Sequence, residues 1–176
     1  MMNTLTIPGV FLEINSLGTL IIGPSGIGKS RLGLSLIHRG HRLVADDAVT
    51  LTKSGQKLIG TCSPISQDFL HLRDLGIMNV RKMFGDGAVC SSSVLEFVIQ
   101  LTTRKPEIPM DMALTGLENS RTFMSIEIQE QIIFVDHQQD LVALIEASVR
   151  KQQLKQSGYS ASADFIARQQ RLMDSD

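Results

Sequence analysis

The segment Gly23-Pro24-Ser25-Gly26-Ile27-Gly28-Lys29-Ser30 fits the pattern G-x-x-x-x-G-K-[ST] without a gap. Glycines here let the backbone wrap around an oxygen-rich anion, so that successive N–H groups point at a β-phosphate. Lys29 adds a cation toward the β- and γ-phosphates, and the Ser30 hydroxyl is a ligand for Mg²⁺. The segment therefore predicts a loop that binds the phosphates of a nucleotide.

The residues on either side predict the strand and the helix that this motif requires. Residues 17–22 read as a strand whose continuous apolar end suits a central place in a sheet. Apolar residues from position 32 onward indicate a helix that Gly40 ends. A chance glycine turn without a ligand is the competing interpretation of the loop, and this strand–loop–helix context favours the phosphate-binding one.

An acidic pair, Asp46-Asp47, ends the next predicted strand, residues 41–45. A right-handed crossover places the end of that strand at the same sheet edge as the glycine loop. One carboxylate there can hold Mg²⁺, directly or through water, and the other can take a proton from a hydroxyl nucleophile. Capping of a turn is the alternative role for such a pair. A phosphate loop at the same edge favours the chemical role.

The chain as a whole predicts one α/β domain, residues 1–176, in which a mixed sheet carries the phosphate loop, helices flank the sheet and further helices lie at the C-terminus. Alternation of apolar residues at 10–14 indicates a strand before a turn at Asn15-Ser16. The later pattern is irregular over 102–119. Strands are expected at 49–52, 57–59, 69–72, 94–101, 122–128 and 131–135, and helices at 78–84, 140–156 and 162–173, the last with Phe165 and Ile166 inward.

Composition excludes several classes of protein. The 17 Lys+Arg and 18 Asp+Glu give a net charge of -1, without the broad positive field of a nucleic-acid or anionic-membrane binder. The two cysteines, Cys62 and Cys90, form no C-x-x-C pair and have no nearby histidine cluster, which argues against zinc or redox chemistry. With no signal peptide and no apolar run approaching the ~18 residues of a membrane span, a cytoplasmic location is expected.

Several segments together resemble the C-terminal catalytic domain of the bacterial HPr kinase/phosphorylase family. They are the loop 23–30, the run Arg39-Gly40-His41-Arg42-Leu43-Val44-Ala45-Asp46-Asp47, the runs 75–80 and 83–89, and the tail 141–173. The resemblance covers nearly the whole chain in order and spacing. Members of that family use ATP and Mg²⁺ to phosphorylate a serine of the phosphocarrier protein HPr, and many also remove this phosphate with inorganic phosphate. Members form hexamers, and many carry an N-terminal domain that this sequence does not show.

The resemblance implies a role for individual residues. Lys29 would bind the β- and γ-phosphates, Ser30 and Asp47 would support the metal, and Asp46 would be the base that acts on the seryl hydroxyl. Arg73 matches the family's signature arginine and is a candidate phosphate contact. HPr would be the protein substrate, and a hexamer the assembled form.

Several positions depart from the family's pattern. Pro8 stands where the family has a histidine, and Arg31 where a glutamate commonly follows the loop serine. His71 and Asp74 replace the glutamate and the glycine of the E-I-R-G signature, and the run 137–140, His-Gln-Gln-Asp, stands for P-G-R-N. Loss of one electrostatic contact typically costs about 10²- to 10³-fold in rate, so nucleotide binding is expected to survive better than turnover.

These departures leave more than one function open. The leading hypothesis is an ATP-dependent serine kinase acting on HPr, without the dephosphorylation activity, because the histidine partner of Asp46 is missing. Arg31 is expected to pair with a carboxylate of the acidic edge. His71 and Gln139 motivate the alternative of a degenerate regulatory module that binds nucleotide without turnover. A small-molecule kinase with an altered acceptor pocket is the third reading.

Overall fold

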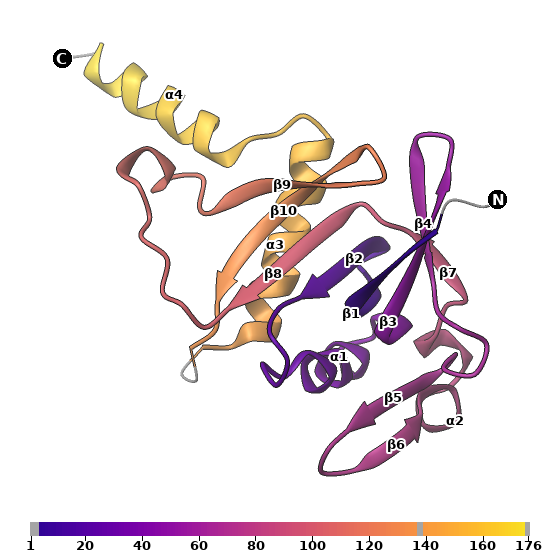
Figure 1. The fold of residues 1–176 in the computed structure, drawn as a ribbon. Coiled ribbons are helices and arrows are strands. Elements are labelled where there is room, and N and C mark those ends of the chain that lie inside the picture. The colour runs from indigo at the N-terminus through magenta and orange to yellow at the C-terminus, as the bar shows by residue number, and fades with distance from the viewer. Residues whose placement is uncertain (1–3, 137–138, 175–176) are drawn as a thin grey trace.

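The computed structural model describes residues 4–136 and 139–174, and its main element is a mixed sheet (Figure 1). Over these residues the sheet has eight strands, in the order β7 (Ser92–Val94), β4 (Lys57–Thr61), β3 (Arg42–Ser54), β1 (Thr4–Ile14), β2 (Leu17–Ile22), β8 (Phe97–Thr102), β10 (Ile126–Phe134) and β9 (Glu118–Phe123). Strands β2, β8 and β10 run parallel to one another. The remaining neighbours are antiparallel.

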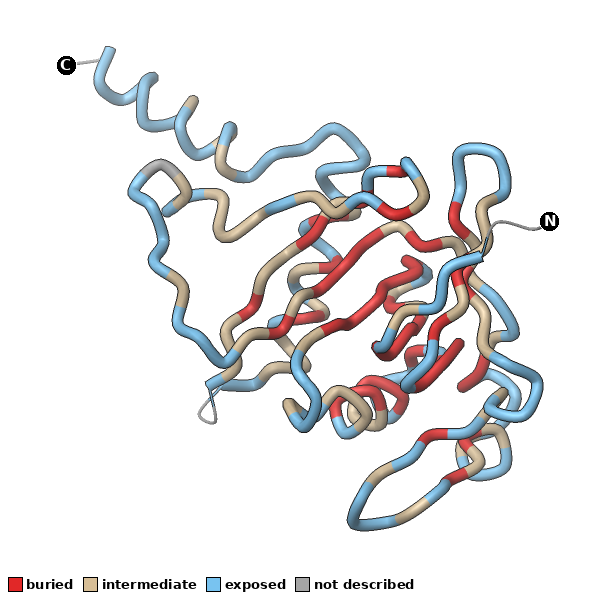
Figure 2. Tube along the Cα trace, viewed as in Figure 1, coloured by how far each residue is buried: buried red, intermediate tan, exposed pale blue. Residues whose placement is uncertain are grey.

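Two helices, α1 (Lys29–His38) and α3 (Leu141–Gln156), cover one face of the sheet. Leu36 of α1 and Ile145 of α3 are fully buried in one cluster with apolar residues of β1, β2 and β8. The opposite face forms a second cluster, which comes from the strands and from Leu95 between β7 and β8. Figure 2 shows this burial concentrated in the central strands. These layers confirm the predicted fold class, a mixed α/β sheet flanked by helices.

The smaller elements lie outside the main sheet. A two-stranded hairpin of β5 (Phe69–Leu72) and β6 (Gly76–Asn79) packs near α1 and leads into α2 (Val80–Phe84). Short 3₁₀ helices span Asp86–Ala88 and Met110–Met112. The last helix, α4 (Ala161–Met173), extends away from the sheet (Figure 1). No helix in the described ranges is long and apolar enough to cross a membrane.

Strand β3 differs from its prediction, because it continues through Asp46-Asp47 to Ser54 instead of ending at the pair. β1 reaches back to Thr4 and remains paired with β3 over this length, with Val10 opposite Asp46 and Gly9 opposite Asp47. The pair therefore lies inside a long strand. Asp47 has a φ of +68°, a local left-handed conformation within the strand.

Strand β1 also lies between β2 and β3, which the predicted crossover did not anticipate. Both β2 and β3 are antiparallel to β1, so they run parallel to each other, as expected. The helix α1 connects them over one face of the sheet. The loop after β2 and the Asp46 side chain of β3 consequently both lie near the start of α1, so the expected proximity of the loop and Asp46 is retained.

Three further boundaries were wrong. The last hairpin turns at Met124-Ser125, where φ is +48° and +63°, and not between residues 128 and 131. Two left-handed residues match a type I′ turn, but Met-Ser has none of the Asn, Asp or Gly residues that this type of turn favours. The strand predicted at 94–101 divides into β7 and β8, and the helix predicted at 78–84 begins at Val80.

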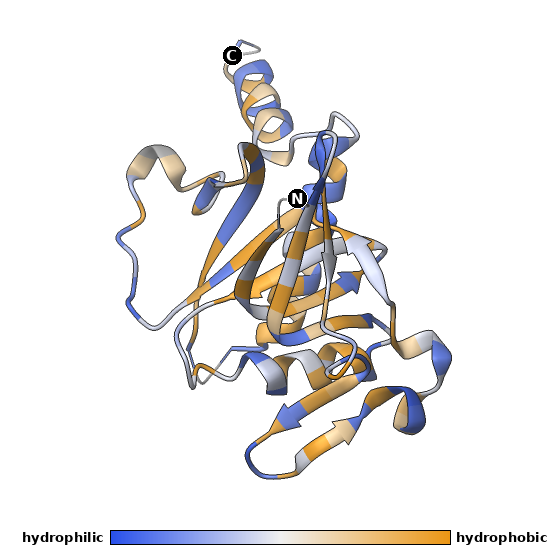
Figure 3. Ribbon diagram, turned by 45° about the vertical axis from the view of Figure 1, so that its right-hand side comes forward, coloured by the Kyte–Doolittle hydropathy of each residue, from blue (hydrophilic) through white to orange (hydrophobic). Residues whose placement is uncertain are grey.

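Helix α4 forms as predicted but does not bury its apolar side. Phe165 and Ile166, which were expected to face inward, are 49% and 41% exposed, and no described residue of the helix is buried. Figure 3 shows polar and apolar residues alternating along it. The amphipathic pattern correctly predicts a helix, but it does not determine whether that helix packs on its own chain.

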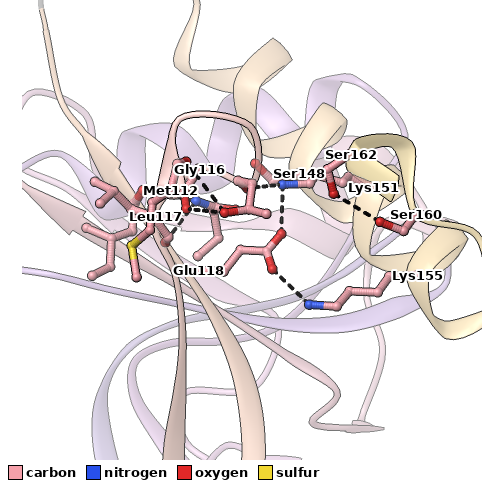
Figure 4. A network of polar contacts seen from close by, with 12 residues as sticks. Met112, Gly116, Leu117, Glu118, Ser148, Lys151, Lys155, Ser160 and Ser162 are labelled. Carbon is pink, nitrogen blue, oxygen red and sulfur yellow. Dashed lines mark hydrogen bonds and ion pairs between the residues drawn. The ribbon is translucent and has the colours of Figure 1, made fainter. Parts of the chain in front are cut away.

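A polar network fastens α3 to the start of β9 (Figure 4). The Glu118 carboxylate accepts hydrogen bonds from Lys151 at 2.7 Å and Lys155 at 2.8 Å, and Lys151 also donates to the carbonyl of Thr115. Burial favours the protonated form of Glu118, but the two lysine contacts outweigh burial and lower the pKa of this carboxyl. Because its charges are paired within the fold, this network is a structural tie.

Candidate functional site

The loop 23–30 joins the end of β2 to the start of α1, as the motif predicts. Gly26 and Gly28 have φ values of +81° and +97°, in the left-handed region that favours glycine. Gly28 is also the N-cap of α1, and its carbonyl accepts the Leu32 N–H at 2.9 Å. The free N–H groups of the first helical turn are therefore presented at the loop, where a phosphate binds favourably.

Lys29 is folded over this loop. Its ammonium group donates to the carbonyl oxygens of Gly23 at 2.9 Å and Pro24 at 3.0 Å. Both acceptors belong to the loop itself, so the cation is held at the mouth of the cradle. It can exchange these neutral acceptors for the oxygens of a phosphate, which make stronger, charge-assisted hydrogen bonds.

Asp46 joins three elements at the floor of the site. Its side chain lies on β3 and is 8% exposed. Oδ1 accepts a hydrogen bond from the Ser30 hydroxyl at 2.8 Å, and Oδ2 accepts one from the backbone N–H of His71 at 3.1 Å. The structure thus brings the loop serine into contact with Asp46, the first residue of the acidic pair. Asp47, the next residue along, is exposed at the surface.

Burial raises the pKa of the Asp46 carboxyl above its ordinary value of 3.8, because water no longer solvates the charge. Hydrogen bonds from the His71 N–H and the Ser30 hydroxyl oppose this effect, and the neighbouring charge of Asp47 adds to it. A carboxylate with a raised pKa is a better proton acceptor.

A pH dependence of stability follows from this shift. The folded chain binds the Asp46 proton more tightly than the unfolded chain does, so the stability contributed by this group is full below the ordinary pKa of 3.8 and is lost as pH rises through the folded-state pKa. Asp46→Asn should therefore have a higher urea midpoint than the native chain at neutral pH, with the gain vanishing in acid. A native chain that is the more stable at neutral pH would contradict this.

The residues around Arg73 lie on the β5–β6 hairpin. Arg73 is exposed in the turn 73–75, and His71 contributes its backbone N–H to Asp46. The expectation that Arg31 pairs with the acidic edge was wrong, since Arg31 bonds the carboxylate of Asp74. Sequence reasoning missed this contact. Its signal was that positions 31 and 74 both depart from the family's pattern, with opposite charges.

Two other departures can be placed in the fold. Pro8 lies on β1 opposite Ala48, beyond the stretch in which β1 pairs with β2. Within the described residues, β1 has a paired strand at Pro8 on the β3 side alone, and proline is tolerated in strands that are unpaired on one side. Gln139 is exposed just before α3. His137 and Gln138 lie outside the described residues.

The oxygen donors at the loop suit a hard cation. Ser30, Asp46 and Asp47 offer a hydroxyl and carboxylates, the ligand types that Mg²⁺ takes when it keeps several waters and shares phosphate oxygens with a nucleotide. Within the described ranges no group of three or more His, Cys, Asp or Glu side chains is arranged to hold a metal by itself. Cys62 and Cys90 are free and half-buried. The donor set therefore fits Mg²⁺ held jointly with phosphates and does not fit a closed zinc site.

Known proteins of one family match this chain over nearly its whole length. The family described as HPr Serine kinase C-terminal domain matches residues 1–169. Proteins named HPr kinase/phosphorylase from Xanthomonas campestris pv. campestris (strain B100) and Xanthomonas oryzae pv. oryzae (strain PXO99A) are 41% identical over 172 residues, 96% of this chain and 54% of theirs. The chain spans about half the length of these curated relatives. The solved Hpr(Ser) kinase/phosphatase from Coxiella burnetii matches with a TM-score of 0.84 and 34% identity, over 92% of this chain and 98% of that one.

Proposed function

Because this chain belongs to the HPr serine kinase C-terminal domain family, we propose that it transfers the γ-phosphoryl group of ATP to a serine hydroxyl of the phosphocarrier protein HPr. The observation that carries this proposal is the contact between the loop serine and the acidic residue, Ser30 Oγ to Asp46 Oδ1 at 2.8 Å. It joins a phosphate cradle to a proton acceptor. In this proposal residues 1–176 act as one catalytic domain in the cytoplasm.

The proposed roles follow the placement of the side chains. The backbone N–H groups of residues 23–30 and the ammonium of Lys29 hold the phosphates. Ser30 and Asp47 offer oxygen ligands to Mg²⁺, which when bound neutralises part of the phosphate charge. Arg73, exposed on the neighbouring turn, supplies a further cation. The local cations compensate for the chain's net charge of -1, which provides no general attraction for ATP.

Asp46 is the proposed base. It takes the proton of the seryl hydroxyl while the seryl oxygen forms a bond to the γ-phosphorus. The bond between that phosphorus and the oxygen bridging to the β-phosphate breaks, and ADP leaves with the electron pair. The raised pKa of Asp46, caused by its burial, supports this role. Oδ2 accepts a hydrogen bond from the backbone N–H of His71, whereas Oδ1 accepts one from the Ser30 hydroxyl, which can rotate.

We propose the kinase direction alone. The position that carries a histidine in the family's pattern is Pro8, paired with Ala48 beside the acidic residues. A proline ring has no group that titrates, so it cannot exchange a proton with Asp46. Removal of phosphate from HPr with inorganic phosphate should therefore be undetectable in this chain.

Assembly into a hexamer is part of the same proposal. Large apolar side chains stay exposed on α4, including Leu172 at 71% and Met173 at 78%. Exposed apolar faces of this kind are typical of surfaces that pack against another chain. Sedimentation at several protein concentrations tests this part independently of catalysis.

The decisive experiment mixes the chain with HPr, Mg²⁺ and ATP labelled at the γ-phosphate. Label should appear on a serine of HPr. If ATP binds but no label is transferred, the chain is instead a nucleotide-binding regulatory module. One observation favours that second candidate, because position 31, next to the loop serine, carries an arginine paired with Asp74 and offers no carboxylate toward a metal.

Lys29→Ala should raise the ATP dissociation constant by about 10- to 100-fold, since a hydrogen bond to a charged group contributes about 1.5–3 kcal/mol. Isothermal titration measures the change. Lys57→Ala removes an exposed ammonium from the start of β4 and serves as the matched control, with unchanged affinity. Equal affinities for the Lys29→Ala chain and the native chain would show that the loop does not hold the phosphates.

A further inference from the structure

The β5–β6 hairpin is attached to the phosphate-loop region at two polar points. The backbone N–H of His71 donates to Asp46 Oδ2 at 3.1 Å, and the Arg31 guanidinium binds the Asp74 carboxylate. Asp46 itself bonds the loop serine, and Arg31 directly follows that serine. Both anchors therefore lead to the same short segment at the beginning of α1.

Arg73 lies between these two anchors along the chain. An extended residue spans about 3.3–3.6 Å, so Arg73 is within two such steps of the His71 anchor and adjacent to the Asp74 anchor. In the described ranges Arg73 makes no hydrogen bond or ion pair with the rest of the protein. Its guanidinium is therefore available to an anionic ligand, whereas that of Arg31 is already committed.

Apolar packing secures the hairpin at its base but not at its tip. Leu70 on β5 is fully buried in the cluster beneath α1. Leu75, in the turn, and Ile77, two residues beyond it, are 64% and 73% exposed. The turn that carries Arg73 thus has little burial to hold it, and the Arg31–Asp74 pair is the side-chain contact that ties it to α1.

We propose that Arg31 and Asp74 form a latch, a pair of positioning residues that holds the turn 73–75 against the start of α1 and keeps Arg73 beside the phosphate loop. The latch rests on the proposed function in one respect, since its effect on affinity requires ATP to bind in the loop 23–30. The pairing also neutralises Asp74, whose negative charge would otherwise repel the phosphates.

The attraction between Arg31 and Asp74 is expected to be weak and to depend on the salt concentration. Its side chains are 72% and 68% exposed, so water and salt screen their attraction. Exposed ion pairs have small effects, and each single variant, Arg31→Gln or Asp74→Asn, should raise the ATP dissociation constant by about 3- to 5-fold. Hydrogen exchange of the amides in the turn should accelerate by a similar factor in these variants. It should also accelerate in the native chain when the salt concentration is raised.

The test is a set of variants measured by ATP titration and by hydrogen exchange. The double variant Arg31→Gln/Asp74→Asn should bind ATP no more weakly than either single variant, because both remove the same interaction. The charge-swapped pair Arg31→Asp/Asp74→Arg should restore slow exchange in the turn. In an Arg73→Gln background, neither single variant should weaken binding further. Lys155→Gln, which removes a lysine of the Glu118 network, is the control and should match the native chain.

Different results would overturn the latch and the proposed function. Additive losses in the double variant, fast exchange in the charge-swapped pair, or undiminished losses in the Arg73→Gln background would each show that Arg31 and Asp74 do not position Arg73. If the native chain binds no ATP, the proposed function fails. Hydrogen exchange still decides the latch in that case, and exchange that is the same in all variants would rule it out.

Discussion

Asp46→Asn is expected to lower the rate of phosphoryl transfer by about 10²- to 10⁴-fold while changing the ATP dissociation constant by less than about threefold. An amide cannot take the seryl proton. It can still accept the His71 N–H through its oxygen and donate to Ser30 Oγ through its nitrogen, so both contacts of the native carboxylate have a replacement. Single-turnover transfer of label from ATP to HPr measures the rate, and titration measures affinity.

The control for this variant is Glu127→Gln, the same chemical change at an exposed position on β10. It should transfer phosphate at the native rate. A folded Asp46→Asn chain that also transfers at the native rate would show that Asp46 is not the base. A large loss of ATP affinity with the rate unchanged at saturation would instead assign Asp46 to nucleotide or metal binding.

Gly18→Ala is expected to destabilise the fold by about 3 kcal/mol, at the upper end of what overpacking costs. A Cβ at this position on β2 would lie 1.7 Å from the carbonyl oxygen of Val94 and 2.8 Å from its carbonyl carbon. A backbone group cannot rotate aside as a side chain can. β2 and the segment between β7 and β8 would have to separate, which would disturb the Glu96 N–H bond to the Gly18 carbonyl, now 2.9 Å.

Chemical denaturation measures this loss of stability, provided that the free energy of unfolding depends on denaturant concentration with the same slope in both proteins. Gly87→Ala is the matched control, because a Cβ there meets nothing within 4 Å. It should change the free energy of unfolding by less than about 0.5 kcal/mol, as surface substitutions usually do. If Gly18→Ala and Gly87→Ala are equally stable, the close approach of Val94 to β2 does not exist in solution.

Local patterns predicted most elements of this fold. Alternating residues located β1, and the turn predicted at Asn15-Ser16 is present, with φ values of +50° and +66°. The helical spacing of apolar residues over 140–156 predicted α3, and the structure adds that Asp140 caps it by accepting the Ala143 N–H at 3.0 Å. The turn at Met124-Ser125 escaped prediction because its conformation is imposed by the pairing of β9 with β10 and not by its residue types.

One part of the candidate site could also be predicted from local sequence, and another part depended on strand pairing. The loop 23–30 and the start of α1 depend on residues adjacent in the chain, and their glycine spacing was sufficient to predict them. The continuation of β3 through Asp47 depended on a partner strand, β1, that lies far away in sequence. The pattern of apolar residues does not specify which strand will lie beside which, and so it could not show that the acidic pair sits inside a strand.

The amino-acid sequence was enough to predict the α/β class, the glycine-rich loop 23–30 between a strand and a helix, and the resemblance to its family, because each depends on short-range spacing. The arrangement in three dimensions decided that Ser30 contacts Asp46, that the His71 amide orients the same carboxylate, and that Arg31 binds Asp74. These partners are 16, 25 and 43 residues apart. Ser30 and Asp46 meet because α1 packs against β3, and the two hairpin contacts form because Leu70 is buried under α1 and brings the hairpin with it. No single segment contains these packing preferences.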